Sequence, residues 1–226
     1  MKTFKPSNED EWHEFRRQHL TSTELAGLHL SRTARAWQEL REQKESGERW
    51  GGNQYTEWGT AREPILAPLV TDVDSRLDYN ADPQTIIINP EDERLCGTPD
   101  LFSEDGGVIG EIKTAKHPFT GGYWHDWCPD RYYLQIQANM WHTGAEACVL
   151  LVEYYREQDG EFSPVEYEYQ VIHYDPTVVK ELESTAAQWF AWLDGTTPDW
   201  MGEVTSLEDA DEVEDLVAQL ADAEEK

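Results

Sequence analysis

The sequence predicts a mixed α/β fold in which a small β-sheet is flanked by helices. The first 75 residues carry helix-capping signals and helical periodicity, whereas the middle of the chain carries β-branched and alternating runs separated by a further helical segment. Hydrophobic residues make up 38% of the 226 residues and aromatic residues 12%, enough apolar material for a buried core. We expect one domain over residues 1–202, with a helical part over 1–75 and a sheet core over 80–175, followed by an acidic tail over 203–226.

The N-terminal part is predicted to begin with three helices. Ser7 precedes an acidic first turn and is the expected N-cap of a helix that ends near His19. Thr21 and Glu24 have the spacing of a capping box, which begins the second helix. A third helix is expected to begin at Ser31.

The remaining elements follow from turn residues and periodicity. Residues 56–73 predict a fourth helix, which Pro64 and Pro68 must kink or delimit. Strands are predicted over residues 85–88, 94–102, 108–114, 147–155 and 165–173, and helices over 132–143 and from Asp175 to Gly195.

The charge of the chain is extreme. Eighteen Lys and Arg stand against 46 Asp and Glu, which gives a formal net charge of −28. Such a balance normally argues against binding a polyanion, because Lys and Arg supply most of the affinity for nucleic acid. However, half of the basic residues lie within the first 60 positions, so this block is the candidate anion-facing surface.

The chain also lacks signals for export or membrane insertion. No run of about 18 apolar residues occurs, and the N-terminus has no apolar segment of the signal-peptide type. We therefore expect a cytoplasmic protein without a membrane partner. The three cysteines are far apart and are expected to be buried thiols.

A constellation in the middle of the chain predicts chemistry. Because side chains alternate along a strand, Glu111 and Lys113 point to the same face, and antiparallel pairing brings Asp100 near them. The two carboxylates and the Ile112 carbonyl form a hard-oxygen site suited to Mg²⁺ or Mn²⁺. With Lys113 orienting a water, this site would hydrolyse a phosphodiester. The same pattern also arises by chance in acidic proteins, where Glu-x-Lys on a strand is usually an exposed polar face.

Several segments together resemble a known family. They are residues 12–16 (WHEFR) with 20–24 (LTSTE), residues 58–63 (WGTARE), residues 96–100 (CGTPD) with 111–113 (EIK), and residues 134–141 (LQIQANMW). In this order they resemble the PD-(D/E)XK nuclease superfamily, and within it the lambda-exonuclease-like viral recombinase nucleases of the YqaJ type. The resemblance spans residues 12–155 and implies a restriction-endonuclease-like core.

The resemblance implies a role for each matching residue in the catalytic centre. Asp100, Glu111 and the Ile112 carbonyl would hold the metal, and Lys113 would position the attacking water. Glu63 would help to hold a second metal or its water shell. Gln135 would support the site by hydrogen bonds. Some members of the superfamily hold an iron–sulfur cluster through four cysteines, and we expect none here because the chain has only three.

Two N-terminal residues are implied in DNA binding. Arg16 would contact a DNA phosphate, with the 5′-terminal phosphate as one candidate. Thr23 stands where the family commonly has Ser and keeps the hydroxyl for a phosphate contact. Ordinary roles remain open for three of the implied residues. Arg16 could pair with Glu9 or Glu14 on its own helix, Glu63 could be a solvated acid, and Gln135 could be an exposed amide.

The resemblance implies a Mg²⁺-dependent exonuclease that digests linear double-stranded DNA from 5′ to 3′ in phage-type recombination or replication. It also implies a homo-oligomer, commonly a trimeric ring, and a single-strand annealing protein as partner. Two alternatives remain open: a structure-specific endonuclease on the same core, and a non-enzymatic acidic protein that mimics DNA or binds a basic partner.

Overall fold

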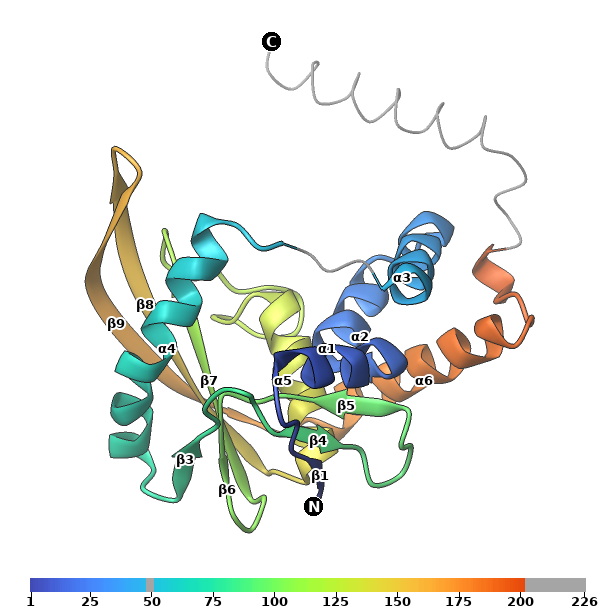
Figure 1. Cartoon of the computed structure of the whole chain (residues 1–226), viewed down its shortest axis with the longest axis horizontal. Helices are drawn as coiled ribbons and strands as arrows, with labels where there is room; N and C mark the ends of the chain where they lie inside the picture. The colour runs from blue at the N-terminus through green and yellow to red at the C-terminus, as the bar shows by residue number, and fades with distance from the viewer. Residues whose placement is uncertain (48–50, 202–226) are drawn as a thin grey trace.

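The structure, a computed structural model, describes residues 1–47 and 51–201, so the predicted acidic tail over 203–226 lies outside the described residues. The helices are α1 (Glu9–Gln18), α2 (Ser22–Leu30), α3 (Ala34–Ser46), α4 (Gln54–Val73), α5 (Asp130–Thr143) and α6 (Pro176–Leu193) (Figure 1). The strands are β1 (Lys2–Phe4), β2 (Leu20–Thr21), β3 (Leu77–Tyr79), β4 (Ile86–Ile88), β5 (Leu95–Gly97), β6 (Leu101–Ser103), β7 (Val108–Ala115), β8 (Ala147–Gln158) and β9 (Glu161–His173).

The strands of the described residues form two sheets. The larger sheet has the order β3-β6-β7-β8-β9, and the smaller one the order β1-β4-β5-β2. Strand β7 pairs antiparallel with β6 and parallel with β8, and α5 is the crossover between β7 and β8. The prediction of a mixed α/β fold is therefore confirmed, although the sheet is more extensive than the five strands predicted.

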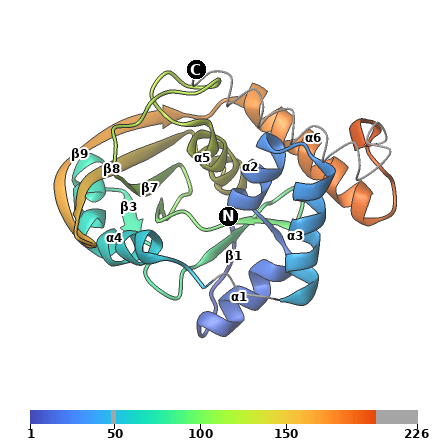
Figure 2. The same cartoon turned by 90° about the horizontal axis from the view of Figure 1, so that it is seen from above.

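Helices cover both faces of the larger sheet. On one face, α4 packs Leu66, Ala67 and Val70 against β6, β7 and β8. On the other face, α2, α5 and α6 build the larger core, in which Trp37 and Trp189 are almost fully buried. Figure 2 shows α1, α2, α3 and α6 gathered on one side of the molecule and α4 on the other, with α5 between them.

Strand β2 joins the N-terminal helices to the sheet strand that leads to the predicted site. Its two residues pair in parallel with β5, in the register Leu20–Leu95 and Thr21–Cys96. The capping box at Thr21 and Glu24 is present and begins α2 directly after this strand. As a result, the start of α2 lies beside the strand that precedes Asp100.

Two predicted N-caps lie elsewhere. Asn8, not Ser7, caps α1 by accepting the Glu11 amide at 2.9 Å, whereas the Ser7 hydroxyl donates to the Glu11 carboxylate. Thr33, not Ser31, caps α3, because the Ser31 amide is already bonded to the last turn of α2. Both errors move the start of a helix by only a few residues.

Helix α4 continues through Pro64 and Pro68, so neither proline delimits it. Both side chains are exposed, which leaves their rings free of the core. Pro64 has no N–H to donate to the Thr60 carbonyl. On the opposite side of α4, Arg62 forms a bidentate ion pair with buried Glu153 of β8, which ties the helix to the sheet.

The predicted strand over residues 94–102 is two strands. It is interrupted between β5 and β6 because Pro99 cannot donate a ladder hydrogen bond, and because the side chain of Asp100 accepts the Ile112 amide instead. Strands β1, β2 and β3 were not predicted. They have two or three residues each, too few to show an alternating pattern.

Strands β8 and β9 form a long hairpin whose tip extends beyond the sheet (Figure 1). Its turn at Asp159 and Gly160 has positive φ at both residues, as a two-residue hairpin turn requires. The ladder between β7 and β8 ends at the pair Ala115–Tyr154, so the tip beyond that point is two-stranded. Phe162 stacks on Trp58 and connects the tip to the start of α4.

None of the helices in the described part of the chain has both the length and the apolar character needed to cross a membrane.

Candidate active site

Strand β7 carries the centre of the candidate site. Glu111 and Lys113 lie on the same face of β7, and the Lys113 Nζ donates to the Glu111 Oε2 at 2.9 Å. The Asp100 Oδ2 accepts the Ile112 amide at 2.7 Å, which places Asp100 beside the same strand. The convergence of Asp100, Glu111 and Lys113 that the strand periodicity predicts is therefore present.

Glu111 is completely buried, and its two oxygens have different partners. Lys113 holds Oε2, and the Asn139 side-chain amide of α5 donates to Oε1 at 2.5 Å. Asn139 in turn accepts the Ser22 hydroxyl of α2 at 2.6 Å. These contacts compensate the cost of burying a carboxylate, which is several kcal/mol when the charge is left alone.

A cleft of about 730 Å³ opens above this centre. It lies between α1, α4, the N-terminal end of α5 and the segments that flank β4 and β5. Its lining is Glu9, Trp12, His13, Arg16, Thr60, Glu63, Asp82, Pro83, Gln84, Thr98, Asp100 and Gln135. Four of these twelve side chains are carboxylates, and the guanidinium of Arg16 is the one permanent cation. A polyanion that enters such a cleft requires additional positive charge.

The ionisation of the acids reflects this crowding. Burial raises the pKa of Asp100 well above its usual range, and the nearby Glu111 raises it further. Burial also raises the pKa of Glu63 to about 7, against the attraction of Lys113 and with repulsion from Glu111 and Asp82. Burial by itself would lower the pKa of Lys113, but attraction from Glu111 and Asp100 outweighs it, so Lys113 stays charged.

The donor set suits a hard divalent cation. Among the described residues, no protein group donates a hydrogen bond to Glu63 or to the second oxygen of Asp100, so these oxygens are available. A cation between them would relieve the repulsion that raises both pKa values. In the described conformation, no three His, Cys, Asp or Glu side chains surround a common point at coordination distance. The fit therefore rests on the chemistry of the donors.

Arg16 faces the cleft rather than its own helix surface. Its Nη1 donates to the Thr98 hydroxyl at 2.7 Å, and its guanidinium lies over the Trp12 ring at 4.2 Å. Of its other four N–H groups, none has a hydrogen-bond partner within the described chain. The alternative of an ion pair with Glu9 or Glu14 is not what the structure shows.

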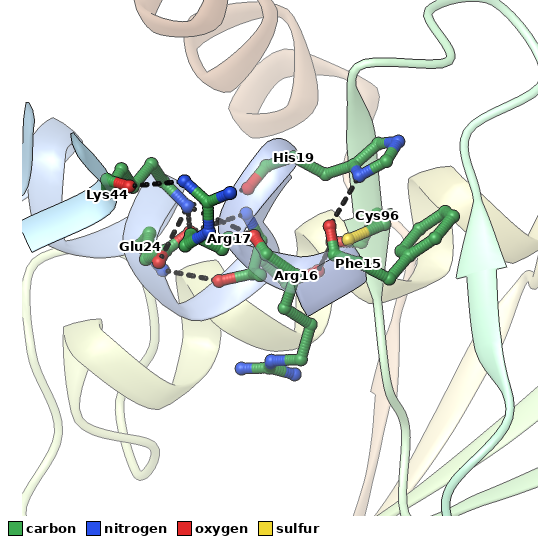
Figure 3. Close-up of polar contacts among 9 residues, drawn as sticks. Phe15, Arg16, Arg17, His19, Glu24, Lys44 and Cys96 are labelled. Carbon is green, nitrogen blue, oxygen red and sulfur yellow. Dashed lines mark hydrogen bonds and ion pairs between the residues drawn. The ribbon is translucent and has the colours of Figure 1, made fainter. Parts of the chain in front are cut away.

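The neighbouring Arg17 has a different role. It binds Glu14 with both ends of its guanidinium and donates to the Lys44 carbonyl at 3.0 Å. The Lys44 ammonium in turn donates to the carbonyls of Arg16 and His19 and to Glu24. Figure 3 shows Arg17 and Lys44 turned towards each other, whereas the Arg16 side chain points away from them. Arg17 therefore secures the end of α1, and Arg16 is left for the cleft.

The remaining predicted residues differ in whether they line the cleft. Gln135 lines the cleft from the second turn of α5. Ile112 is buried between Glu111 and Lys113, with its side chain on the opposite face in the core under α4. Thr23 is exposed on the first turn of α2 and does not line the cleft, so its predicted phosphate contact stays a prediction.

Sequence reasoning missed Asn139, Ser22 and Thr98. A signal existed for Asn139, because it lies four residues after Gln135 and so on the same face of the helix. The sequence could not show that this face meets Glu111. Ser22 and Thr98 lie within the quoted motifs, but their partners are 117 and 82 residues away in the chain.

Comparison with known proteins identifies relatives. The YqaJ-like viral recombinase domain matches residues 11–146, more than half of the chain. An alkaline exonuclease from Laribacter hongkongensis has the same fold, with a TM-score of 0.60, 18% identity, and coverage of 93% of this chain and 99% of that chain. The structure of that exonuclease with dAMP matches equally well at 17% identity. A phage-related exonuclease from Haemophilus somnus has a TM-score of 0.56 at 16% identity, with 77% of this chain and 94% of its own covered.

No curated protein matches the sequence. The solved structures share the fold with this chain, which confirms the predicted restriction-endonuclease-like architecture.

The raised pKa of Glu63 predicts a pH-dependent stability of the metal-free protein. Because the folded-state pKa of about 7 exceeds the ordinary value of 4.5, stability is lost as pH rises through this interval. Glu63→Gln removes that loss, so in EDTA the free energy of unfolding of the variant should rise relative to that of the wild type by about 3 kcal/mol between pH 4.5 and pH 8. Urea unfolding at both pH values measures this gain. Glu57→Gln, an exposed acid on the same helix, is the control, and equal gains for the two variants would contradict the assignment.

Proposed function

Because this chain belongs to the YqaJ-like viral recombinase family, we propose that it is a metal-dependent exonuclease acting on linear double-stranded DNA, from the 5′ towards the 3′ end. The observation that carries the proposal is the fully buried Glu111 beside Lys113, with Asp100 at the same strand and an acidic cleft above. A protein that only displayed acidic charge would have no use for a lysine paired with a buried carboxylate. The related alkaline and phage exonucleases have the same fold and support the nuclease assignment.

Asp100, Glu111, the Ile112 carbonyl and Glu63 would hold the cation, Mg²⁺ or Mn²⁺. When bound, such a cation polarises the phosphate and lowers the pKa of a water. Lys113 lies 2.9 Å from Glu111 and keeps its charge, so it can donate to the attacking water and to the phosphate. Gln135 borders the same cleft and would hold water or phosphate by hydrogen bonds.

DNA would enter the cleft along α1. Arg16 is oriented by Thr98 and Trp12, with donors left for a phosphate oxygen. Thr98 is two residues before Asp100, so a phosphate held by Arg16 would lie close to the metal ligands. Thr23 at the start of α2 would contact the strand outside the cleft.

The first test is hydrolysis of linear duplex DNA with Mg²⁺ or Mn²⁺. Asp100→Asn is expected to lower kcat by about 10³-fold, because several kcal/mol of transition-state stabilisation depend on the cation. Glu57→Gln is the matched control and should retain full activity. Covalently closed circular DNA should remain intact. Cleavage of the circle would identify the endonuclease alternative, and equal activity of wild type and Asp100→Asn would reject the proposal. Inactivity with every metal, together with retention of a basic protein, would indicate the acidic DNA mimic.

Arg16 provides the test of end recognition. Arg16→Ala is expected to lower kcat/KM on 5′-phosphorylated duplex by about 10- to 100-fold, which is the worth of a charge-assisted hydrogen bond. On duplex with 5′-hydroxyl ends the loss should be smaller. Arg17→Ala is the control, since its guanidinium is committed to Glu14 and to the Lys44 carbonyl. An equal decrease in kcat/KM on the 5′-phosphorylated and the 5′-hydroxyl duplex would show that Arg16 does not bind the terminal phosphate.

Partners complete the proposal. The family resemblance supports a homo-oligomer in the form of a trimeric ring. The single-stranded product would then be bound by an annealing protein. Light scattering on the full chain should give three times the 26.1 kDa of one chain. A monomer at the concentrations at which DNA is digested would contradict the ring.

A further inference from the structure

Asn139 lies between the N-terminal part of the chain and the predicted metal ligand Glu111. Its Nδ2 donates to the Glu111 Oε1 at 2.5 Å, and its Oδ1 accepts the Ser22 hydroxyl at 2.6 Å. All three side chains are buried, with exposed fractions of 1%, 0% and 3% for Asn139, Glu111 and Ser22. Water cannot replace either hydrogen bond without a rearrangement.

Glu111 and the Ser22 hydroxyl together favour one orientation of the Asn139 amide. A carboxylate accepts only, so it needs the NH₂ end of the amide. With its oxygen towards Glu111, the amide would repel the carboxylate and leave it without this donor. The hydroxyl has one proton, and the Asn139 oxygen at 2.6 Å is closer to it than the Cys96 carbonyl at 3.5 Å. Donation from Ser22 therefore keeps the NH₂ group on Glu111.

Gly97 leaves room for this pair. A Cβ atom at position 97 would lie 2.2 Å from the Asn139 Oδ1 and 2.6 Å from the Ser22 hydroxyl oxygen, far below any contact distance. Strand β5 can approach α5 and α2 only because residue 97 has no side chain. The glycine of the CGTPD segment thus leaves the space in which Asn139 and Ser22 form their hydrogen bond.

We propose that Asn139 is a positioning residue that holds Glu111 in the rotamer needed for metal binding, and that Ser22 acts through Asn139 by fixing its amide. The inference rests on the proposed function, since it assumes that Glu111 is a metal ligand. Lys113 restrains one oxygen of Glu111, and without Asn139 the carboxylate could turn about its last bond. Asn139 touches neither DNA nor metal in this role.

Helix α5 offers a matched comparison. Gln137 is also a buried amide with two partners, but it donates to the His173 carbonyl and accepts the Asp175 amide, away from Glu111. If both amides only support the fold, Asn139→Ala and Gln137→Ala should behave alike. If Asn139 positions Glu111, only its variant should change metal affinity.

The experiment is a calorimetric titration of the full chain with Mn²⁺ in the absence of DNA, for the wild type and four variants. Asn139→Ala is expected to raise the Kd for Mn²⁺ by about 10- to 100-fold, the usual effect of losing a residue that orients a ligand. Ser22→Ala should raise it by a smaller factor. The double variant should equal Asn139→Ala alone, because Ser22 acts through Asn139. Gln137→Ala should leave the Kd unchanged. Circular dichroism and urea unfolding in EDTA show that each variant is folded.

The outcomes separate this inference from the proposed function. If the wild type binds Mn²⁺ and digests DNA but Asn139→Ala has the wild-type Kd, the positioning role is wrong and the nuclease stands. If the effects of Ser22→Ala and Asn139→Ala on the Kd for Mn²⁺ are additive in the double variant, Ser22 does not act through the Asn139 amide. If the wild type neither binds Mn²⁺ nor digests DNA, the proposed function itself fails.

Discussion

The burial of Glu111 is the constraint on which the rest of the site depends. A carboxylate with no exposed surface in the middle of a sheet is tolerated only when each oxygen has a donor. One donor is Lys113 on the same strand, and the other is Asn139 on the crossover helix α5. The amide needs Ser22 of α2, and the approach of these side chains needs the glycine at position 97. The packing of the sheet core and the geometry of the candidate active site therefore depend on the same side-chain contacts.

The N-terminal helices pack against the sheet through contacts of their own. The parallel pairing of β2 with β5 brings α2 against the sheet, and Lys44 of α3 secures the junction of α1 and α2 through two backbone carbonyls and Glu24 (Figure 3). Arg16 projects from this junction into the cleft. Of the basic residues in the N-terminal block, Arg16 lines the cleft, beside Glu9, Trp12 and His13 of the same helix.

Much of this arrangement could be predicted from the sequence, because it follows from local rules. Capping residues located the helices to within a few positions, and the two-residue period of a strand placed Glu111 and Lys113 on one face. Long-range partners could not be predicted in this way. The contact of Arg16 with Thr98, and that of Ser22 with Asn139, depend on how α1 and α2 pack against β5 and α5, which no short segment encodes. The break between β5 and β6 depends on Asp100 replacing a backbone acceptor, a choice visible only once β7 is beside it.

The hairpin of β8 and β9 divides the molecule into parts of unequal local stability. Within the sheet, β8 has a neighbour on each side, but beyond Tyr154 it pairs with β9 alone. A two-stranded ribbon is marginal in water, so the tip depends on Phe162 packing against Trp58 at the start of α4. The tip and the first turns of α4 therefore form one cooperative unit, which can open while the sheet stays folded. Glu63 lies less than two turns further along α4, beyond the ion pair of Arg62 with buried Glu153 that ties the helix to the sheet. This ion pair therefore separates local opening of the tip from the rim of the acidic cleft.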